Sequence, residues 1–197
     1  MRISILGRGP LAEPLARLAE RAGHTVRWAE GEAPSRADDA ADLAILAGSR
    51  ATVESMLASI PLSISQDIVV VDATIPTEVE GHGDRGAATG WEAEWIQAAL
   101  PGARIVRAFA SVPAEALAAV LSRYTSGQPA SLAVPLAGDD RQAKALVGTF
   151  MREIGVEPFD LGMLSIADVL DPGGALWGKA LSQVEMLEAV GWLSGDG

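Results

Sequence analysis

The chain has 197 residues, 49% of them hydrophobic, a formal net charge of −11 at pH 7, two histidines and no cysteine. This length predicts one domain with a substantial core, and the acidic balance argues against binding to nucleic acid or to an anionic membrane surface. The absence of cysteine excludes a disulfide scaffold and a thiolate metal site, and two histidines disfavour a histidine-based metal site.

The chain opens with an apolar run that ends in a glycine turn. Residues 2–6 are short, apolar and rich in isoleucine, which predicts a buried parallel strand. The sequence Gly7-Arg8-Gly9-Pro10-Leu11-Ala12 follows, with the pattern Gly-x-Gly-x-x-Ala. In a dinucleotide-binding turn the first glycine permits the tight turn, the second lets a pyrophosphate approach the backbone, and the alanine allows close helix packing. Residues 11–22 have helical apolar spacing, so the motif has the context that this binding requires; the alternative is a glycine turn without a ligand.

A second strand is predicted at residues 25–28. Glu30 lies just past its end, at about the spacing where an acidic residue binds the ribose hydroxyls of adenosine. A carboxylate at that place favours NAD and repels the additional phosphate of NADP. The alternative is that Glu30 and Glu32 are solvated acids of a polar loop.

Strand and helix patterns alternate along the rest of the chain. Further strands are predicted at 43–47, 67–72, 103–108, 131–135 and 156–160, and helices at 51–59, 91–100, 113–121, 139–153 and 175–193. This alternation predicts an α/β fold with a Rossmann-type, doubly wound parallel sheet. A glycine-rich loop at 76–90 follows the strand that ends at Asp72, and we expect it over the carboxyl edge of the sheet, where ligands bind.

Seven short segments, taken in order, resemble one known family. They lie at 5–10, 22–24, 41–47, 71–76, 107–114, 134–140 and 164–165. With these segments the chain is similar to the NADP oxidoreductases that depend on the deazaflavin coenzyme F-420. It also resembles the related dinucleotide-binding reductases, which include the cytosolic domains of the STEAP-type metalloreductases.

The resemblance implies a Rossmann domain at residues 1–160 and a small C-terminal helical extension at 161–197, packed on the same domain. It implies hydride transfer between a nicotinamide, as NAD or NADP, and coenzyme F-420 or FMN. The implied pyrophosphate contacts, after the turn glycine Gly7, are Arg8, Gly9, Pro10 and Leu11. Gly48 and Ser49 would lie near the adenosine and its phosphates. The implied nicotinamide contacts are Ala73, Thr74, Ala110 and Ser111.

The chain departs from the family's pattern at the cofactor edge. The family's Ser-Arg or Asn-Arg pair, which grips the NADP phosphate, is replaced here by Glu30 and Gly31, with Arg36 as a substitute cation in the same loop. Gly48-Ser49 replaces a Val-Pro or Ile-Pro pair, Ala110 an Asn or His, and Pro10 an Asn, with loss of a backbone donor. Because of these changes, the alternative function is that of a catalytically degenerate module that binds a nucleotide or a partner protein.

No acid–base or nucleophile constellation is evident, as expected for a reaction that two cofactors carry out. The expected partners are a nicotinamide nucleotide and a small-molecule hydride acceptor. With no membrane-length apolar run and no charged leader, we expect a cytoplasmic protein. Apolar residues recur along the helix expected at 175–193, namely Leu176, Leu181, Val184, Leu187 and Val190. This helix either folds back on its own domain or meets the same helix of a second subunit in a homodimer.

Overall fold

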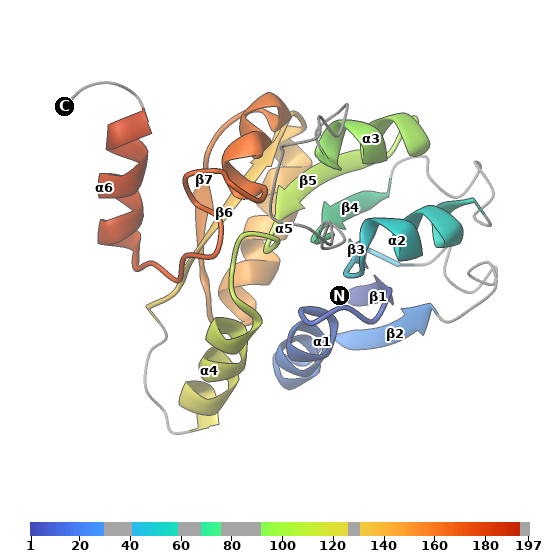
Figure 1. Ribbon diagram of the computed structural model, residues 1–197. Coiled ribbons are helices and arrows are strands. Elements are labelled where there is room, and N and C mark those ends of the chain that lie inside the picture. Colours follow the sequence, from blue (N-terminus) through green and yellow to red (C-terminus); the bar gives the residue numbers. More distant parts are fainter. Residues whose placement is uncertain (30–40, 59–67, 76–91, 126–130, 194–197) are drawn as a thin grey trace.

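The computed structural model describes residues 1–29, 41–58, 68–75, 92–125 and 131–193 (Figure 1). Its centre is a seven-stranded sheet in the order β2-β1-β3-β4-β5-β6-β7. The strands are β1 (Arg2–Leu6), β2 (Thr25–Ala29), β3 (Leu43–Leu46), β4 (Val69–Asp72), β5 (Arg104–Ala108), β6 (Ala133–Gly138) and β7 (Glu157–Asp160). The predicted α/β fold of Rossmann type is therefore confirmed.

The order of the first five strands creates a switch point between β1 and β3. Strand β1 pairs with β2 on one side and with β3 on the other, and all pairs from β2 to β5 are parallel. Chain crossovers on the two sides of such a point run in opposite directions and leave a crevice at the carboxyl ends of the strands, where ligands bind in this class of sheet.

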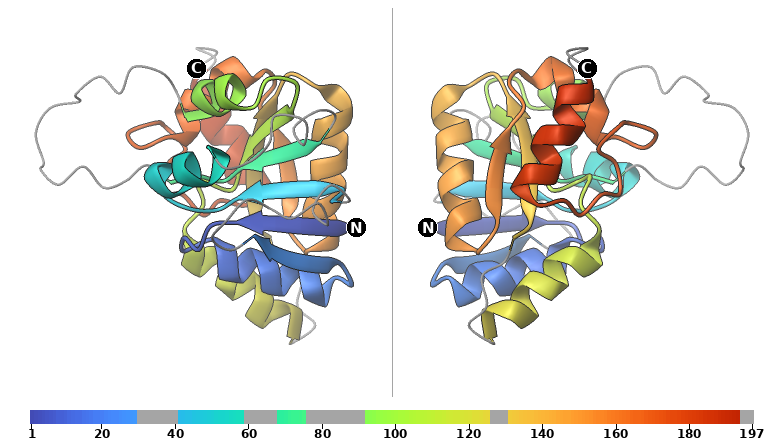
Figure 2. Two further views of the ribbon diagram at one scale, coloured as in Figure 1. Left: turned by 90° about the vertical axis from the view of Figure 1, so that its right-hand side faces the viewer. Right: turned by 90° about the vertical axis from the view of Figure 1, so that its left-hand side faces the viewer.

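Helices cover both faces of the sheet (Figure 2). One core cluster contains apolar residues of α1 (Ala12–Arg21), α4 (Ala114–Thr125) and α5 (Arg141–Glu153). The other contains residues of α2 (Arg50–Leu57), α3 (Glu92–Ala99) and the 3-10 helix η3 (Leu164–Leu170). Strand side chains alternate between the clusters, as the pleat requires: Ile3 and Ile5 belong to the first and Leu6 to the second.

Strand β6 is the exception to the parallel order. It pairs antiparallel with β5, so that Leu136 lies opposite Ala108 and Gly138 opposite Val106. Strand β7 is parallel to β6. Both therefore end at the edge of the sheet opposite the carboxyl ends of β1–β5. The chain has to return from that edge after β7, and it does so through η3.

The last helix is shorter than the sequence pattern predicts. Helix α6 covers Gln183–Leu193, and the expectation of a helix from residue 175 is wrong because 175–182 forms turns and a bridge. Gly178 has a φ of +69°, which a helix cannot accommodate. A capping box then starts α6: the Glu185 carboxylate accepts bonds from the backbone N–H and the hydroxyl of Ser182.

The C-terminal residues have a small core of their own. Leu170, Leu176 and Met186 pack together against Ala133 of β6. None of the helices in the described ranges has the length and apolar character that a membrane crossing requires. The division of the chain at residue 160 stays a prediction.

Candidate functional site

The glycine turn after β1 is packed directly against the end of β3. The Gly9 N–H donates to the carbonyl oxygen of Ala47 at 2.7 Å, and Gly7 has a φ of +97°. A Cβ added to Gly7 would lie 2.9 Å from that oxygen, and one added to Gly9 would lie 3.0 Å from it. The sequence pattern predicts that Gly9 is small so that a pyrophosphate can approach the backbone. The structure shows that the chain's own backbone excludes a Cβ at Gly7 and leaves only a tight fit for one at Gly9.

The N-terminus of α1 begins at this turn without a side-chain cap. The Ala12 N–H bonds to the carbonyl of Gly9 at 3.0 Å, and no side chain caps the helix. None of the described hydrogen bonds uses the amides of Leu11 or Glu13. Such amides, together with the helix dipole, attract an anion.

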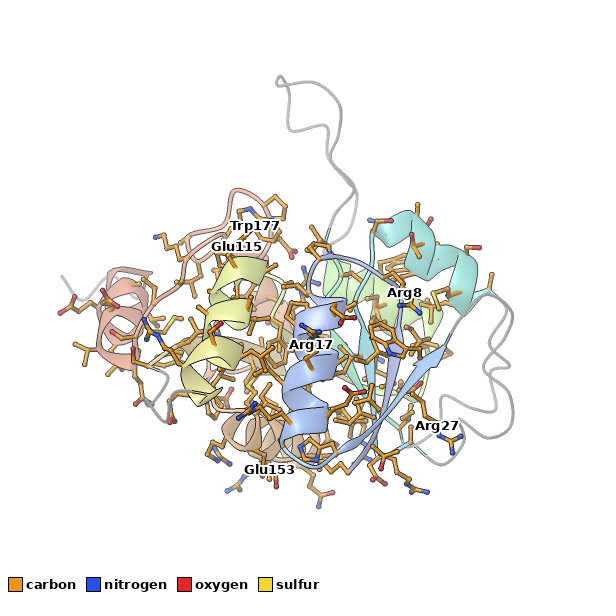
Figure 3. The ribbon with its side chains drawn as sticks, turned by 90° about the horizontal axis from the view of Figure 1, so that it is seen from below. Arg8, Arg17, Arg27, Glu115, Glu153 and Trp177 are labelled. Atoms are coloured by element: carbon orange, nitrogen blue, oxygen red, sulfur yellow. The ribbon has the colours of Figure 1, made fainter. Side chains whose placement is uncertain are left out.

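Two arginines flank the switch point in a chain whose net charge is −11. The guanidinium of Arg8 lies over the indole of Trp28, 4.4 Å from the ring centroid, and Arg8 is exposed (Figure 3). Arg50, the first residue of α2, lies 5.0 Å from the ring centroid of Trp95 and also pairs with Glu54. The indoles fix where these charges lie. Cations beside an open helix N-terminus make this end suitable for a polyanion such as a pyrophosphate.

The residues after β3 lie beside the glycine turn. A Cβ on Gly7 would be 3.1 Å from the Cα of Gly48, and the Gly48 carbonyl accepts a bond from the Ile75 N–H at 3.0 Å. The Ser49 hydroxyl caps α2 by accepting from the Thr52 N–H at 3.3 Å. The structure thus brings Gly7, Gly9, Gly48 and Ser49 together at the switch point.

The residues assigned to the nicotinamide lie further along the same edge, and all of them are buried. Ala73, Thr74, Ala110 and Ser111 each have at most 4% of their surface exposed. Phe109, just before the last two, is a buried non-glycine residue with a φ of +67°. Side chains rarely adopt this conformation, and such strained residues cluster at functional sites.

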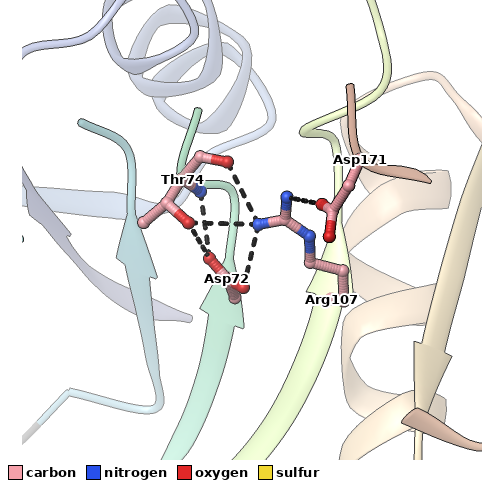
Figure 4. A network of polar contacts seen from close by, with 4 residues as sticks. All are labelled: Asp72, Thr74, Arg107 and Asp171. Carbon is pink, nitrogen blue, oxygen red and sulfur yellow. Dashed lines mark hydrogen bonds and ion pairs between the residues drawn. The ribbon is translucent and has the colours of Figure 1, made fainter. Parts of the chain in front are cut away.

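A buried ionic network joins this end to the C-terminal residues (Figure 4). Nη1 of Arg107 lies 2.8 Å from Oδ2 of Asp72 and donates to both the carbonyl and the hydroxyl of Thr74 at 3.0 and 3.1 Å. Nη2 donates to Oδ1 of Asp171, which follows η3. The other Asp72 oxygen accepts from the Thr74 hydroxyl at 2.6 Å and from its N–H at 3.0 Å. The network therefore connects β4, β5 and the segment after η3.

The network keeps Arg107 charged although it is fully buried. Burial by itself lowers the pKa of the guanidinium, but the carboxylates of Asp72 and Asp171 outweigh this effect and raise the pKa above its usual value. Removal of one member of such a network is expected to cost about 3–5 kcal/mol, because it leaves a buried charge without compensation.

The sequence argument did not identify Arg107, Asp72 or Asp171 as site residues. One signal was available: Arg107 is a charged residue in the apolar run of β5, and a buried charge needs a partner. The partner Asp171 is 64 positions away, and no spacing rule connects the two. Glu30, Arg36 and the loop at 76–90 lie outside the described residues.

Surface hollows lie beside α4 and beside α5. One of about 270 Å³ is formed between α4 and the residues before α6, including Ala119, Leu132 and Leu181. The other, of about 570 Å³, follows α5 and β7 and is lined by Lys144, Gly148 and Asp160 among others. Neither contains a residue predicted to bind the cofactor.

Comparison with known proteins shows similarity of fold. No family model matches the chain, and no curated protein matches it. A hypothetical protein from Sinorhizobium meliloti has a TM-score of 0.74 and 20% identity, over 93% of this chain and 96% of that one. A protein from Arthrobacter sp. FB24, provisionally named an F420-dependent NADP-reductase, has a TM-score of 0.68 and 20% identity, over 84% and 86%.

A pyrroline carboxylate reductase from Plasmodium falciparum, with NADP bound, is more distant. Its TM-score is 0.57 at 9% identity, over 86% of this chain and 62% of that one. At these identities the comparisons establish the Rossmann-like architecture, which is also that of the family expected from the sequence segments.

Proposed function

We propose that the chain is an NAD(P)-binding oxidoreductase of the F420-dependent NADP reductase type. It would pass hydride between a nicotinamide and a deazaflavin or flavin. The observation that carries the proposal is the glycine turn at the switch point, where an uncapped helix N-terminus and Arg8 favour a pyrophosphate. The names of the structural neighbours support it, since one is an NADP-reductase by its provisional name and another binds NADP.

In this proposal the chain's own residues bind and orient, and the cofactors supply the redox chemistry. The amides of Leu11 and Glu13 and the guanidinium of Arg8 would hold the pyrophosphate. Gly48 and Ser49 would lie beside the adenosine half. The turn at Phe109 and the residue Thr74 would border the nicotinamide. We also propose that the protein is cytoplasmic.

The second candidate is a nucleotide-binding module without catalysis. The observation that favours it is the burial of Ala73, Thr74, Ala110 and Ser111, because residues that meet a nicotinamide ring need accessible surface. The open end would then bind a nucleotide while the other end serves only the fold.

Calorimetric titration with NAD, NADP, their reduced forms, FMN and a deazaflavin tests the proposal. We expect a nicotinamide nucleotide to bind, and the bound reduced form to be oxidised when the correct flavin or deazaflavin is added. Arg8→Met should weaken nucleotide binding, whereas Arg17→Met is the matched control because Arg17 is exposed and pairs with Glu13 on α1. Binding without any hydride transfer would favour the second candidate, and absence of all binding would exclude both.

Glu30 carries the expectation about cofactor preference. A carboxylate after β2 repels the 2′-phosphate of NADP, so NAD or NADH should bind at least as tightly as NADP or NADPH. Calorimetry on the wild type and on Arg36→Ala measures this directly. A clear preference for NADPH that survives Arg36→Ala would contradict the assignment of Glu30.

A further inference from the structure

The two ends of the candidate site differ in access. At the glycine turn, Gly7, Leu11 and Gly48 are buried, but Arg8 and Pro10 are exposed and Gly9 is half-buried. At the other end, Thr74, Ala110 and Ser111 have between 0 and 4% of their surface exposed. Helix η3 brings the chain back from the opposite edge of the sheet, and the segment 171–181 that follows contacts this buried end; we call it the C-terminal strap (Figure 2).

Three polar contacts attach the C-terminal strap to the rest of the protein, and its buried Leu176 packs in the small C-terminal core. Its first residue, Asp171, is bound to the buried Arg107. In its middle, the Gly178 N–H donates to the carbonyl of Ser111 at 2.8 Å. At its end, the carbonyl of Leu181 accepts from the Ala133 N–H at 2.7 Å. The strap is therefore attached to the two residues, Arg107 and Ser111, that lie before and after the strained turn at Phe109.

We propose that the C-terminal strap is a closure over the nicotinamide end, latched by the Asp171–Arg107 ion pair and by the hydrogen bond between Gly178 and Ser111. This inference rests on the proposed nucleotide binding at the glycine turn. The closed protein accepts the adenosine diphosphate half of a dinucleotide, and the nicotinamide half enters only when the strap is displaced. The strap thus sets whether the protein responds to an adenine nucleotide or to a complete dinucleotide.

Removal of the ion pair tests the proposal. Asp171→Asn should tighten NADH relative to ADP-ribose by about tenfold, since the open form is no longer a minor population. The matched control is Asp168→Asn on η3, because its side chain is outside the network and only its carbonyl contacts Asp171. An equal NADH to ADP-ribose ratio in the wild type and both variants would overturn the latch.

The ligand pair separates this proposal from the proposed function. ADP-ribose binding to the wild type measures the nucleotide site, and the NADH to ADP-ribose ratio measures the strap. If neither ligand binds to any variant, the proposed function fails and the gating role fails with it. In that case hydrogen exchange still measures the latch: Asp171→Asn should speed exchange of the Gly178 amide, and Asp168→Asn should not. Unchanged exchange in Asp171→Asn would show that Asp171 does not hold the strap.

Discussion

The two ends of the carboxyl edge are built on different physical principles. The end at β1 and β3 is fixed by backbone contact: Gly7 approaches Ala47 so closely that it has no room for a Cβ, and Gly9 has little more. The end at β4 and β5 is fixed by charge, through Arg107 and the carboxylates of Asp72 and Asp171. At the end at β1 and β3, backbone packing leaves polar groups available to a ligand. At the end at β4 and β5, the polar groups bind one another in ion pairs.

The largest expected effect separates the two arginines of this edge. Arg107→Met should lower the free energy of unfolding by about 3–5 kcal/mol, because Asp72 remains buried without its partner. Arg8→Met should cost only about 0.5–1 kcal/mol, the value of an exposed cation–π contact. Urea unfolding measures both. Equal losses would show that the two ends do not differ in the way described.

The glycine turn gives the next effect, with a matched pair of positions. Gly7 and Gly23 both have positive φ, +97° and +84°, but only Gly7 has backbone atoms within 4 Å of an added Cβ. Gly23→Ala should therefore cost only the left-handed strain, about 1–2 kcal/mol. Gly7→Ala should cost about 1–3 kcal/mol more, from the overpacking against Ala47. Equal urea midpoints for the two variants would remove the contact argument.

The exposed face of α6 belongs to this comparison because α6 directly follows the C-terminal strap, which contacts the end at β4 and β5. Val184 and Leu187 are 66% and 60% exposed, and the homodimer through this helix stays a prediction. We expect a dimer mass in sedimentation at micromolar concentration and a monomer for Leu187→Asp. Met163→Asp is the matched control, with 67% exposure outside α6. A monomer mass for the wild type, unchanged in Leu187→Asp, would exclude the dimer.

The smallest expected effect is on the pH dependence of stability, and it comes from His24, which lies at neither end of the edge. Burial and the Met1 ammonium lower the pKa of His24 below its ordinary value of 6.5, against the opposing effect of Glu153. The unfolded state then binds more protons as the pH falls through 6.5, so stability is lost on acidification. His24→Gln should flatten the stability profile between pH 7 and the lowered pKa. A wild-type profile that is already flat there would contradict this assignment.

The sequence predicted the elements better than their directions and ends. Strands such as 67–72 are continuous apolar runs, and the alternation with helices identified the Rossmann-type sheet. The antiparallel direction of β6 has no signature in a short apolar run, since strand direction depends on the whole crossover. The helix expected from residue 175 was wrong because apolar spacing alone ignores Gly178. The Ser182-x-x-Glu185 capping box marks the true start and was readable from the sequence.

For the site, the sequence could predict only what local motifs encode. The glycine turn and its helix are contiguous in the chain, so their mutual position follows from a short segment. The Arg107 network joins residues that are 33 and 64 positions apart, and only the folded sheet brings them together. Whether Ala110 and Ser111 face a ligand or the chain's own backbone depends on the same long-range packing.

The reversed direction of β6 also has a consequence for the order of assembly. The Asp171–Arg107 contact closes a loop of 64 residues that contains β6 and β7. Because closing a long loop costs chain entropy, we expect this contact to form late in folding and the segment that it attaches to open early in the native state. The part of the molecule that is completed last would thus also be the first to exchange its amides, and the reversal of a single strand would have created it.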